Sequence, residues 1–143
     1  MDILVNSRLE INMENSIKEV FEKARKIVIK IGSNTLANQD GKINLDFMNQ
    51  LASQCATLIE AGKQIVLVSS GAQVAGVSTI DRWARKKDIH YRQALCAIGQ
   101  VELMDHWRKA FAQYGYHIGQ LLLTKEDFLD PHRTLNMRNT LFT

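Results

Sequence analysis

A lysine near the end of an apolar run is the first feature of this sequence that could do chemistry. Residues 26–31 form a short run of strand character that carries Lys30, and Gly32 and Ser33 follow directly. Burial of an unpaired ammonium is costly, so we expect Lys30 at the carboxyl end of a central strand, where open α/β sheets bind ligands. A turn at Gly32 would let backbone amides approach an anion. The pattern predicts a phosphate site; the alternative is an edge strand whose lysine reaches solvent.

A second turn of similar composition follows the next apolar run. Residues 64–68 are mostly apolar, and they lead directly into Ser69, Ser70, Gly71 and Ala72. A helix that begins at such a turn offers free N–H groups and a partial positive charge, which attract carboxylate or phosphate, and Ser70 would add a hydroxyl. The plainer interpretation is an ordinary strand-to-helix turn with a serine cap. Because the ends of adjacent parallel strands lie together, two such turns favour a shared crevice.

The last helical stretch carries a third group of polar side chains. Asn136, Asn139 and Thr140 fall on one helical face, at positions i, i+3 and i+4. Asparagine is a mediocre helix former, so two of them on one face suggest that their amides have partners. A small amino-acid substrate is one candidate partner. Solvent, or a capping role for Asn136, is the alternative.

Two further features are interpreted as structural. Gly99 lies inside a helical pattern, where glycine costs about 1 kcal/mol relative to alanine, and a close approach to the sheet or to the Ser70 turn would explain it. Residues 82–87 mix cations with Trp83, and Tyr91 and Arg92 follow. Such a mixture suits nucleic acid, but the run is short and we interpret it as a solvated loop, with no nucleic-acid partner.

The elements that must position these residues alternate between strand and helix. We expect strands at 26–31, 64–68 and 117–123, a helix over 45–59 that Asn44 caps and Gly62 ends, and a short helical turn that stops near Gly76. Further helices are expected over 92–114 and from about residue 132. Buried strands that alternate with helices predict an α/β fold with an open, mainly parallel sheet between helices.

Composition fits one well-packed domain. The chain has 143 residues, 45% hydrophobic and 23% charged, and a net charge of +3 that requires no polyanionic partner. No apolar run approaches the roughly 18 residues that cross a bilayer, and the first fifteen residues lack an apolar signal core, so a cytoplasmic location and no membrane partner are expected.

Cys55 and Cys96 are expected to be reduced thiols packed in helices. The four histidines show no metal-ligand spacing, so no protein metal site is assigned.

Taken in order, five segments resemble the amino acid kinase family, in the branch that phosphorylates a glutamate side chain. They are residues 28–33, 65–72, 93–100 with 103–104, 119–124 and 135–141. The resemblance covers residues 25–143, the amino-terminal part of the kinase domain. Residues 1–24 remain as an extension, in which Ser16 and Glu19 form a capping-box pattern for a short amphipathic helix expected to pack on the domain or a partner.

The resemblance implies that ATP donates its γ-phosphoryl group to the side-chain carboxylate of L-glutamate, the first step of proline biosynthesis. By that match Lys30, with Gly32 and Ser33, belongs to the ATP-phosphate site, and Lys30 is the catalytic residue that neutralises charge on the transferred group. Mg²⁺ is implied as the companion of ATP, held mainly through its phosphates.

For the acceptor, the resemblance assigns Ser70, Gly71 and Ala72 to the glutamate site, together with Asn139. A homo-oligomer is implied for the whole protein. Kinase domains of this family are not far short of twice the present length, so we expect an incomplete active site, without the nucleotide-base pocket, and an inactive chain. The alternatives are another amino acid kinase, acting on aspartate, N-acetylglutamate, carbamate or UMP, and a non-catalytic chain that pairs with another one.

Overall fold

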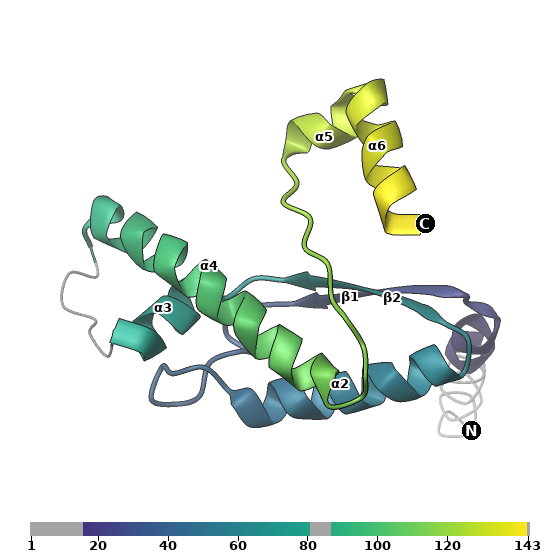
Figure 1. Cartoon of the computed structure of the whole chain (residues 1–143), viewed down its shortest axis with the longest axis horizontal. Coiled ribbons are helices and arrows are strands. Elements are labelled where there is room, and N and C mark those ends of the chain that lie inside the picture. The colour runs from purple at the N-terminus through teal and green to yellow at the C-terminus, as the bar shows by residue number, and fades with distance from the viewer. Residues whose placement is uncertain (1–15, 81–86, 143) are drawn as a thin grey trace, which may run out of the picture.

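The computed structural model describes residues 16–80 and 87–142, which form a mixed α/β structure (Figure 1). Residues 16–23 are helical, and strand β1 (Lys26–Ile31), helix α2 (Leu45–Glu60) and strand β2 (Gln64–Ser69) follow. Helices α3 (Ala72–Ile80) and α4 (Ile89–Ala112) come next, and the chain then leads to α5 (Lys125–Leu129) and α6 (Pro131–Phe142). The predicted α/β class is confirmed.

The described sheet consists of β1 and β2, which pair in parallel from Lys26 opposite Gln64 to Ile31 opposite Ser69. Side chains alternate across a sheet, so Ile29 and Ile31 share one face, which packs against the core. On the other face Val28 is 66% exposed and Val68 is 50% exposed. Within the described residues, the sheet therefore has one packed face and one largely open face.

Helix α2 begins and ends where the sequence predicts. The side chain of Asn44 accepts a hydrogen bond from the backbone N–H of Phe47 at 2.9 Å, which caps the first turn. Met48, Ala52 and Cys55 lie along one stripe of the helix and are buried. Gly62, with φ of 80°, adopts the left-handed conformation that commonly terminates a helix.

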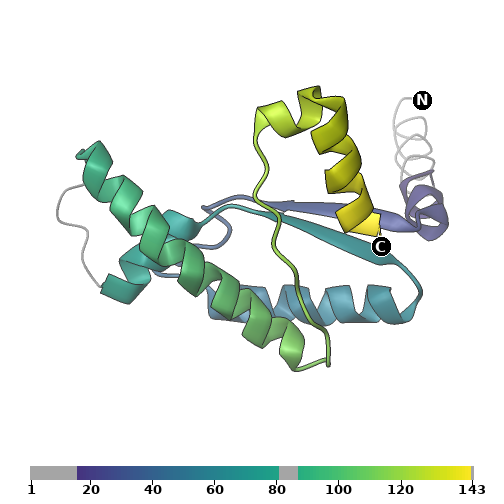
Figure 2. The ribbon, with the colours of Figure 1, turned by 45° about the horizontal axis from the view of Figure 1, so that its top comes forward.

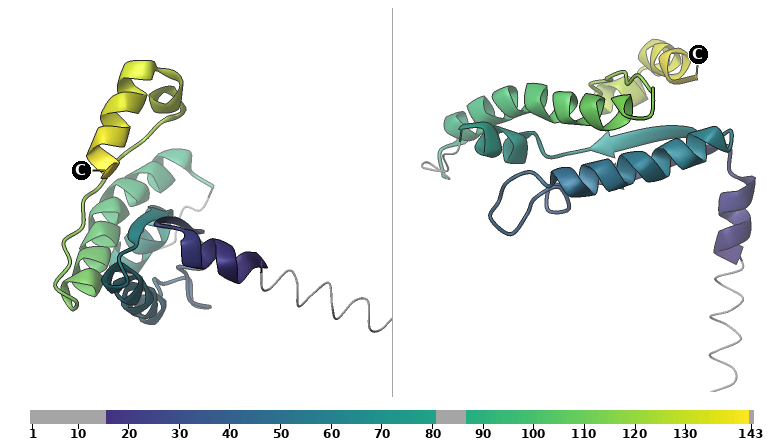
Figure 3. Two further views of the ribbon diagram at one scale, coloured as in Figure 1. Left: turned by 90° about the vertical axis from the view of Figure 1, so that its right-hand side faces the viewer. Right: turned by 60° about the horizontal axis from the view of Figure 1, so that its bottom comes forward.

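Helices α3 and α4 approach each other more closely than ordinary side chains allow (Figure 3). A Cβ atom added at Gly99 of α4 would lie 1.8 Å from the carbonyl oxygen of Ala72, and one added at Gly76 of α3 would lie 2.1 Å from that of Leu95. The expected close approach at Gly99 is thus confirmed, and its target is the start of α3. The prediction that the helical turn stops near Gly76 is wrong: α3 continues to Ile80, and Gly76 lies at the contact with α4.

The predicted third strand is wrong. Residues 117–123 lie in the extended segment between α4 and α5 and form no strand, and Leu122 is 76% exposed. An apolar run becomes a strand only where a neighbouring strand accepts its backbone hydrogen bonds, and here the segment leads away from the sheet (Figures 1 and 2). Beyond it, α5 and α6 pack on each other and stand apart from the other helices.

The short helix over 16–23 is present, but its apolar face does not pack on the rest of the described chain. Ile17, Val20 and Phe21 are 53%, 65% and 56% exposed. The helix is held instead at its end, where the Lys63 ammonium donates to the carbonyl oxygens of Phe21, Glu22 and Ala24 at 3.0, 2.9 and 2.7 Å. A cation at a helix carboxyl terminus satisfies its unpaired carbonyls.

Cys55 and Cys96 lie on α2 and α4 as free thiols, as expected, and burial raises the pKa of the Cys55 thiol. Among the described helices, none is both long and apolar enough to cross a membrane. Most of the basic segment at 82–87, interpreted above as a solvated loop, lies outside the described residues.

Candidate functional site

The sheet brings the two polar turns to the same place. Lys30 is paired opposite Val68 and Ile31 opposite Ser69, so Lys30 and Ser70 both lie at the carboxyl ends of neighbouring parallel strands. The two similar turns in the sequence predicted this arrangement, and the parallel register confirms it. In open parallel sheets this edge is where ligands bind.

Hydroxyl groups join the two turns directly. The backbone N–H and the Oγ of Ser70 each donate to the carbonyl oxygen of Ile31 at 3.1 Å. The Oγ of Ser33 in turn donates to the Oγ of Ser70 at 3.2 Å. Ser33 and Ser70 are exposed, so both hydroxyls face a side from which a ligand can approach.

The Lys30 side chain reaches forward over the Gly32 turn. Its ammonium nitrogen lies 3.5 Å from the position that a Cβ atom would take at Gly32, and the lysine is exposed. Within the described part of the chain, the backbone N–H groups of Gly32, Ser33 and Asn34 find no acceptor. An ammonium, free amides and a hydroxyl around one turn fit the oxygens of a phosphate. The residues present therefore fit the phosphates of ATP.

Two features favour glycine at position 71, and its backbone conformation is the stronger of them. Its φ of 120° is one that other residues rarely adopt, and an added Cβ would lie 2.9 Å from the Cδ1 of Leu36, which is fully buried. Ala72 then begins α3, whose first N–H groups face the same edge of the sheet as Ser70. This is a suitable place for a carboxylate.

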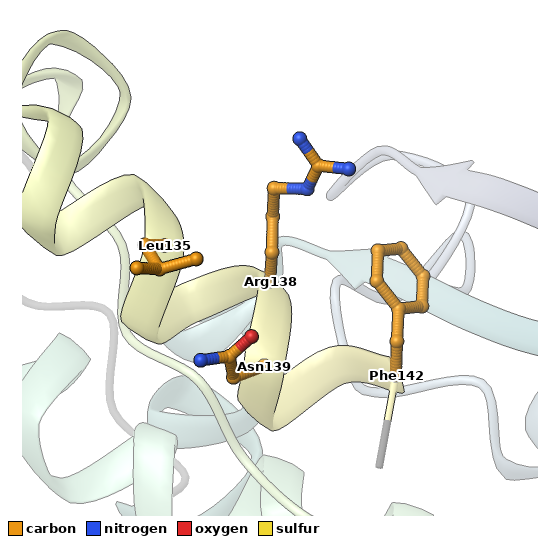
Figure 4. Close-up of a pocket in the computed structure, with 4 residues that line it drawn as sticks. All are labelled: Leu135, Arg138, Asn139 and Phe142. Atoms are coloured by element: carbon orange, nitrogen blue, oxygen red, sulfur yellow. The ribbon is translucent and has the colours of Figure 1, made fainter.

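Asn139 lies elsewhere. It lines a shallow hollow on α6 with Leu135, Arg138 and Phe142 (Figure 4). The Phe142 ring is stacked under the ammonium of Lys26, 3.4 Å from its centroid, at the amino end of β1. Lys26 and Lys30 are four residues apart on the strand, about 13 Å. The structure therefore does not bring Asn139 together with Ser70, and its substrate role stays a prediction.

Two side chains that no sequence pattern singled out, those of Leu36 and Trp107, pack against the turns. Leu36 fills the space beside Gly71, and Trp107 of α4 donates from its indole N–H to the Oγ of Ser69 at 3.2 Å. Trp107 could be assigned only to the apolar face of a helix, although a buried indole N–H usually has a partner. No group of three metal-ligating side chains occurs in residues 16–80 and 87–142.

Similarity to known proteins assigns this chain to a family. The model of the amino acid kinase family matches residues 25–143. This chain belongs to the amino acid kinase family. The match includes both turns at the edge of the sheet and every described helix from α2 to α6.

Relatives within the amino acid kinase family are similar over most of this chain. It is 59% identical over 127 residues to the glutamate 5-kinase of Alkaliphilus metalliredigens, covering 89% of this chain and 48% of that protein. It is 58% identical to the glutamate 5-kinase of Alkaliphilus oremlandii, with the same coverage, and 46% identical over 126 residues to that of Methanococcoides burtonii, covering 88% of this chain and 34% of the relative. The chain thus spans about half the length of the Alkaliphilus relatives.

Proposed function

We propose that residues 25–143 supply the amino-terminal part of a kinase active site that transfers the γ-phosphoryl group of ATP to the γ-carboxylate of L-glutamate. The observation that carries the proposal is the meeting of two turns at one edge of the sheet, joined by the Ser33–Ser70 hydrogen bond with the Lys30 ammonium beside them. The 59% identity to a glutamate 5-kinase favours glutamate as the acceptor.

In this proposal the two turns have different tasks. Lys30, Gly32 and Ser33 bind the ATP phosphates, and the Ser70–Ala72 turn holds glutamate. A γ-carboxylate oxygen forms a bond to the γ-phosphorus as the bond from that phosphorus to the β,γ-bridging oxygen breaks, and γ-glutamyl phosphate and ADP result. The acceptor is already ionised, so no proton must be removed, and the chain's contribution is positioning and charge neutralisation by Lys30.

Mg²⁺, bound mainly to the phosphates, would supply further neutralisation of their charge. A cytoplasmic location, where ATP and glutamate are available, and assembly into a homo-oligomer are parts of the same proposal.

The test uses a completed domain, in which residues 1–143 are joined to the second half of the Alkaliphilus metalliredigens relative. With ATP, Mg²⁺ and L-glutamate it is expected to form an acyl phosphate that hydroxylamine traps as the hydroxamate. Aspartate, N-acetylglutamate, carbamate and UMP serve as alternative acceptors, and preference for any of them would replace glutamate in the proposal.

A polypeptide of residues 1–143 alone is expected to give no product, because phosphoryl transfer needs groups on several sides of the phosphate. Product formed by the pure monomer would contradict that expectation.

The resemblance assigns Asn139 to the glutamate site although the structure places it apart from Ser70, and the Asn139→Ala variant of the completed domain tests that assignment. A role in the substrate site predicts a rise of about tenfold in the KM for glutamate, the effect of one lost hydrogen bond to a charged group. The matched control is Asn136→Ala, which removes the same side chain one turn earlier on α6 and should leave this KM unchanged. Steady-state kinetics with varied glutamate provide the measurement. An unchanged KM in Asn139→Ala would remove this residue from the substrate site.

A further inference from the structure

We infer that Trp107 is a positioning residue for the acceptor turn and that it acts through the hydroxyl of Ser69. This inference rests on the proposed function, because it concerns the turn assigned there to glutamate. Trp107 lies on α4, outside both turns, and does not itself face the proposed ligands.

The hydrogen-bond directions follow from the groups involved. An indole N–H can only donate, so the contact of 3.2 Å between Trp107 Nε1 and Ser69 Oγ uses the serine as acceptor. The single hydroxyl hydrogen of Ser69 remains for the carbonyl oxygen of Ser70, at 3.1 Å. Trp107 thus fixes the rotamer of Ser69, and Ser69 fixes the peptide group that follows Ser70.

The peptide group that Ser69 holds begins at Ser70, the residue that joins the two turns. Ser70 donates to Ile31 through its N–H and its hydroxyl, and it accepts from Ser33. Rotation of the peptide group that follows Ser70 would redirect the chain at Gly71 and alter the start of α3 at Ala72. The indole N–H is therefore linked by two hydrogen bonds to the Ser70 carbonyl, and through the Ser70 residue itself to Ile31 and Ser33.

Packing alone does not account for a tryptophan here. The side chain is 4% exposed, and its ring packs against Phe111, with the centroids 6.2 Å apart, which another aromatic ring could also do. The N–H group distinguishes tryptophan from phenylalanine. Gly99, about 12 Å earlier on the same helix, contacts the carbonyl of Ala72. Helix α4 therefore holds the acceptor turn at two points, on either side of Ser70 and Gly71.

The first test is hydrogen exchange in the 143-residue chain, followed by NMR. The Ser70 amide exchanges when the turn opens. Trp107→Phe and Ser69→Ala each remove the hydrogen bond between Trp107 and Ser69, so each should speed exchange of the Ser70 amide about tenfold relative to the amides of α2. Phe111→Leu is the control: it disturbs the same core without touching Ser69, so it should change the Ser70 amide no more than the others. Equal protection of the Ser70 amide from exchange in the original chain and the three variants would overturn the inference.

The second test is kinetic and uses the completed domain. Trp107→Phe and Ser69→Ala should each raise the KM for glutamate about tenfold while kcat changes less, and the double variant should be no worse than either single variant. Ser69→Thr, which keeps the hydroxyl, should retain the original KM, and so should Phe111→Leu. Unchanged KM values in the first two variants would overturn the positioning role. If the unmodified domain does not phosphorylate glutamate, the proposed function fails, and the exchange measurement still decides whether Trp107 holds the turn.

Discussion

Replacement of Lys30 by alanine is expected to lower kcat of the completed kinase domain about a thousandfold, with little change in the KM for glutamate. The ammonium lies over the Gly32 turn, the place that the proposed function gives to the transferred phosphoryl group. A preorganised charge of this kind stabilises the transition state more than the bound substrates, and removal of one such group costs about 10²–10³ in kcat. Steady-state kinetics with ATP and glutamate varied separately provide the measurement.

The chain offers a matched control for Lys30 on the same strand and the same face of the sheet. Lys26→Ala removes an identical side chain at the amino end of β1, where the ammonium contacts only the Phe142 ring among the interactions described. The lost cation–π contact is worth about 0.5–1 kcal/mol at an exposed site, so kcat should be nearly unchanged. A normal kcat in Lys30→Ala, with a large rise in the KM for glutamate, would instead place Lys30 in acceptor binding.

The second large effect concerns folding. Gly99→Ala is expected to lower the free energy of unfolding by about 3 kcal/mol, because the new methyl group has no space. Its Cβ would lie 1.8 Å from the Ala72 carbonyl oxygen and 2.2 Å from the Gly76 nitrogen, and these are backbone atoms that move only if α3 and α4 separate. Higher helix propensity of alanine offsets about 1 kcal/mol at most.

Gly119→Ala is the control for Gly99→Ala. Gly119 has no atom within 4 Å of an added Cβ, so its replacement should leave stability almost unchanged. Denaturant unfolding of the two variants and the original chain, followed by circular dichroism, makes the comparison. Equal midpoints for Gly99→Ala and the original chain would show that α3 and α4 are not in close contact in solution.

Local patterns in the sequence determined most of the elements around the candidate site. Strand β1, with Lys30 near its end, was predicted from an apolar run followed by glycine, and α2 from a cap at Asn44 and a terminator at Gly62. These features depend on nearest neighbours along the chain, since a cap or a left-handed glycine acts within one turn. The shared edge also followed from sequence, because parallel strands necessarily bring their carboxyl ends together.

Tertiary structure alone decided the features that depend on contacts between distant segments. Residues 117–123 have a strand-like composition, but composition provides no partner for their backbone, and they remain extended without pairing. The position of Asn139 also depended on tertiary structure. The sequence showed that it lies on a polar helix face, but the packing of α6 decided how far it lies from Ser70. The contacts of Gly99 with Ala72 and of Trp107 with Ser69 join residues 27 and 38 positions apart. One-dimensional periodicity shows that such residues are buried, but only the packing of α4 against the end of the sheet shows what they touch.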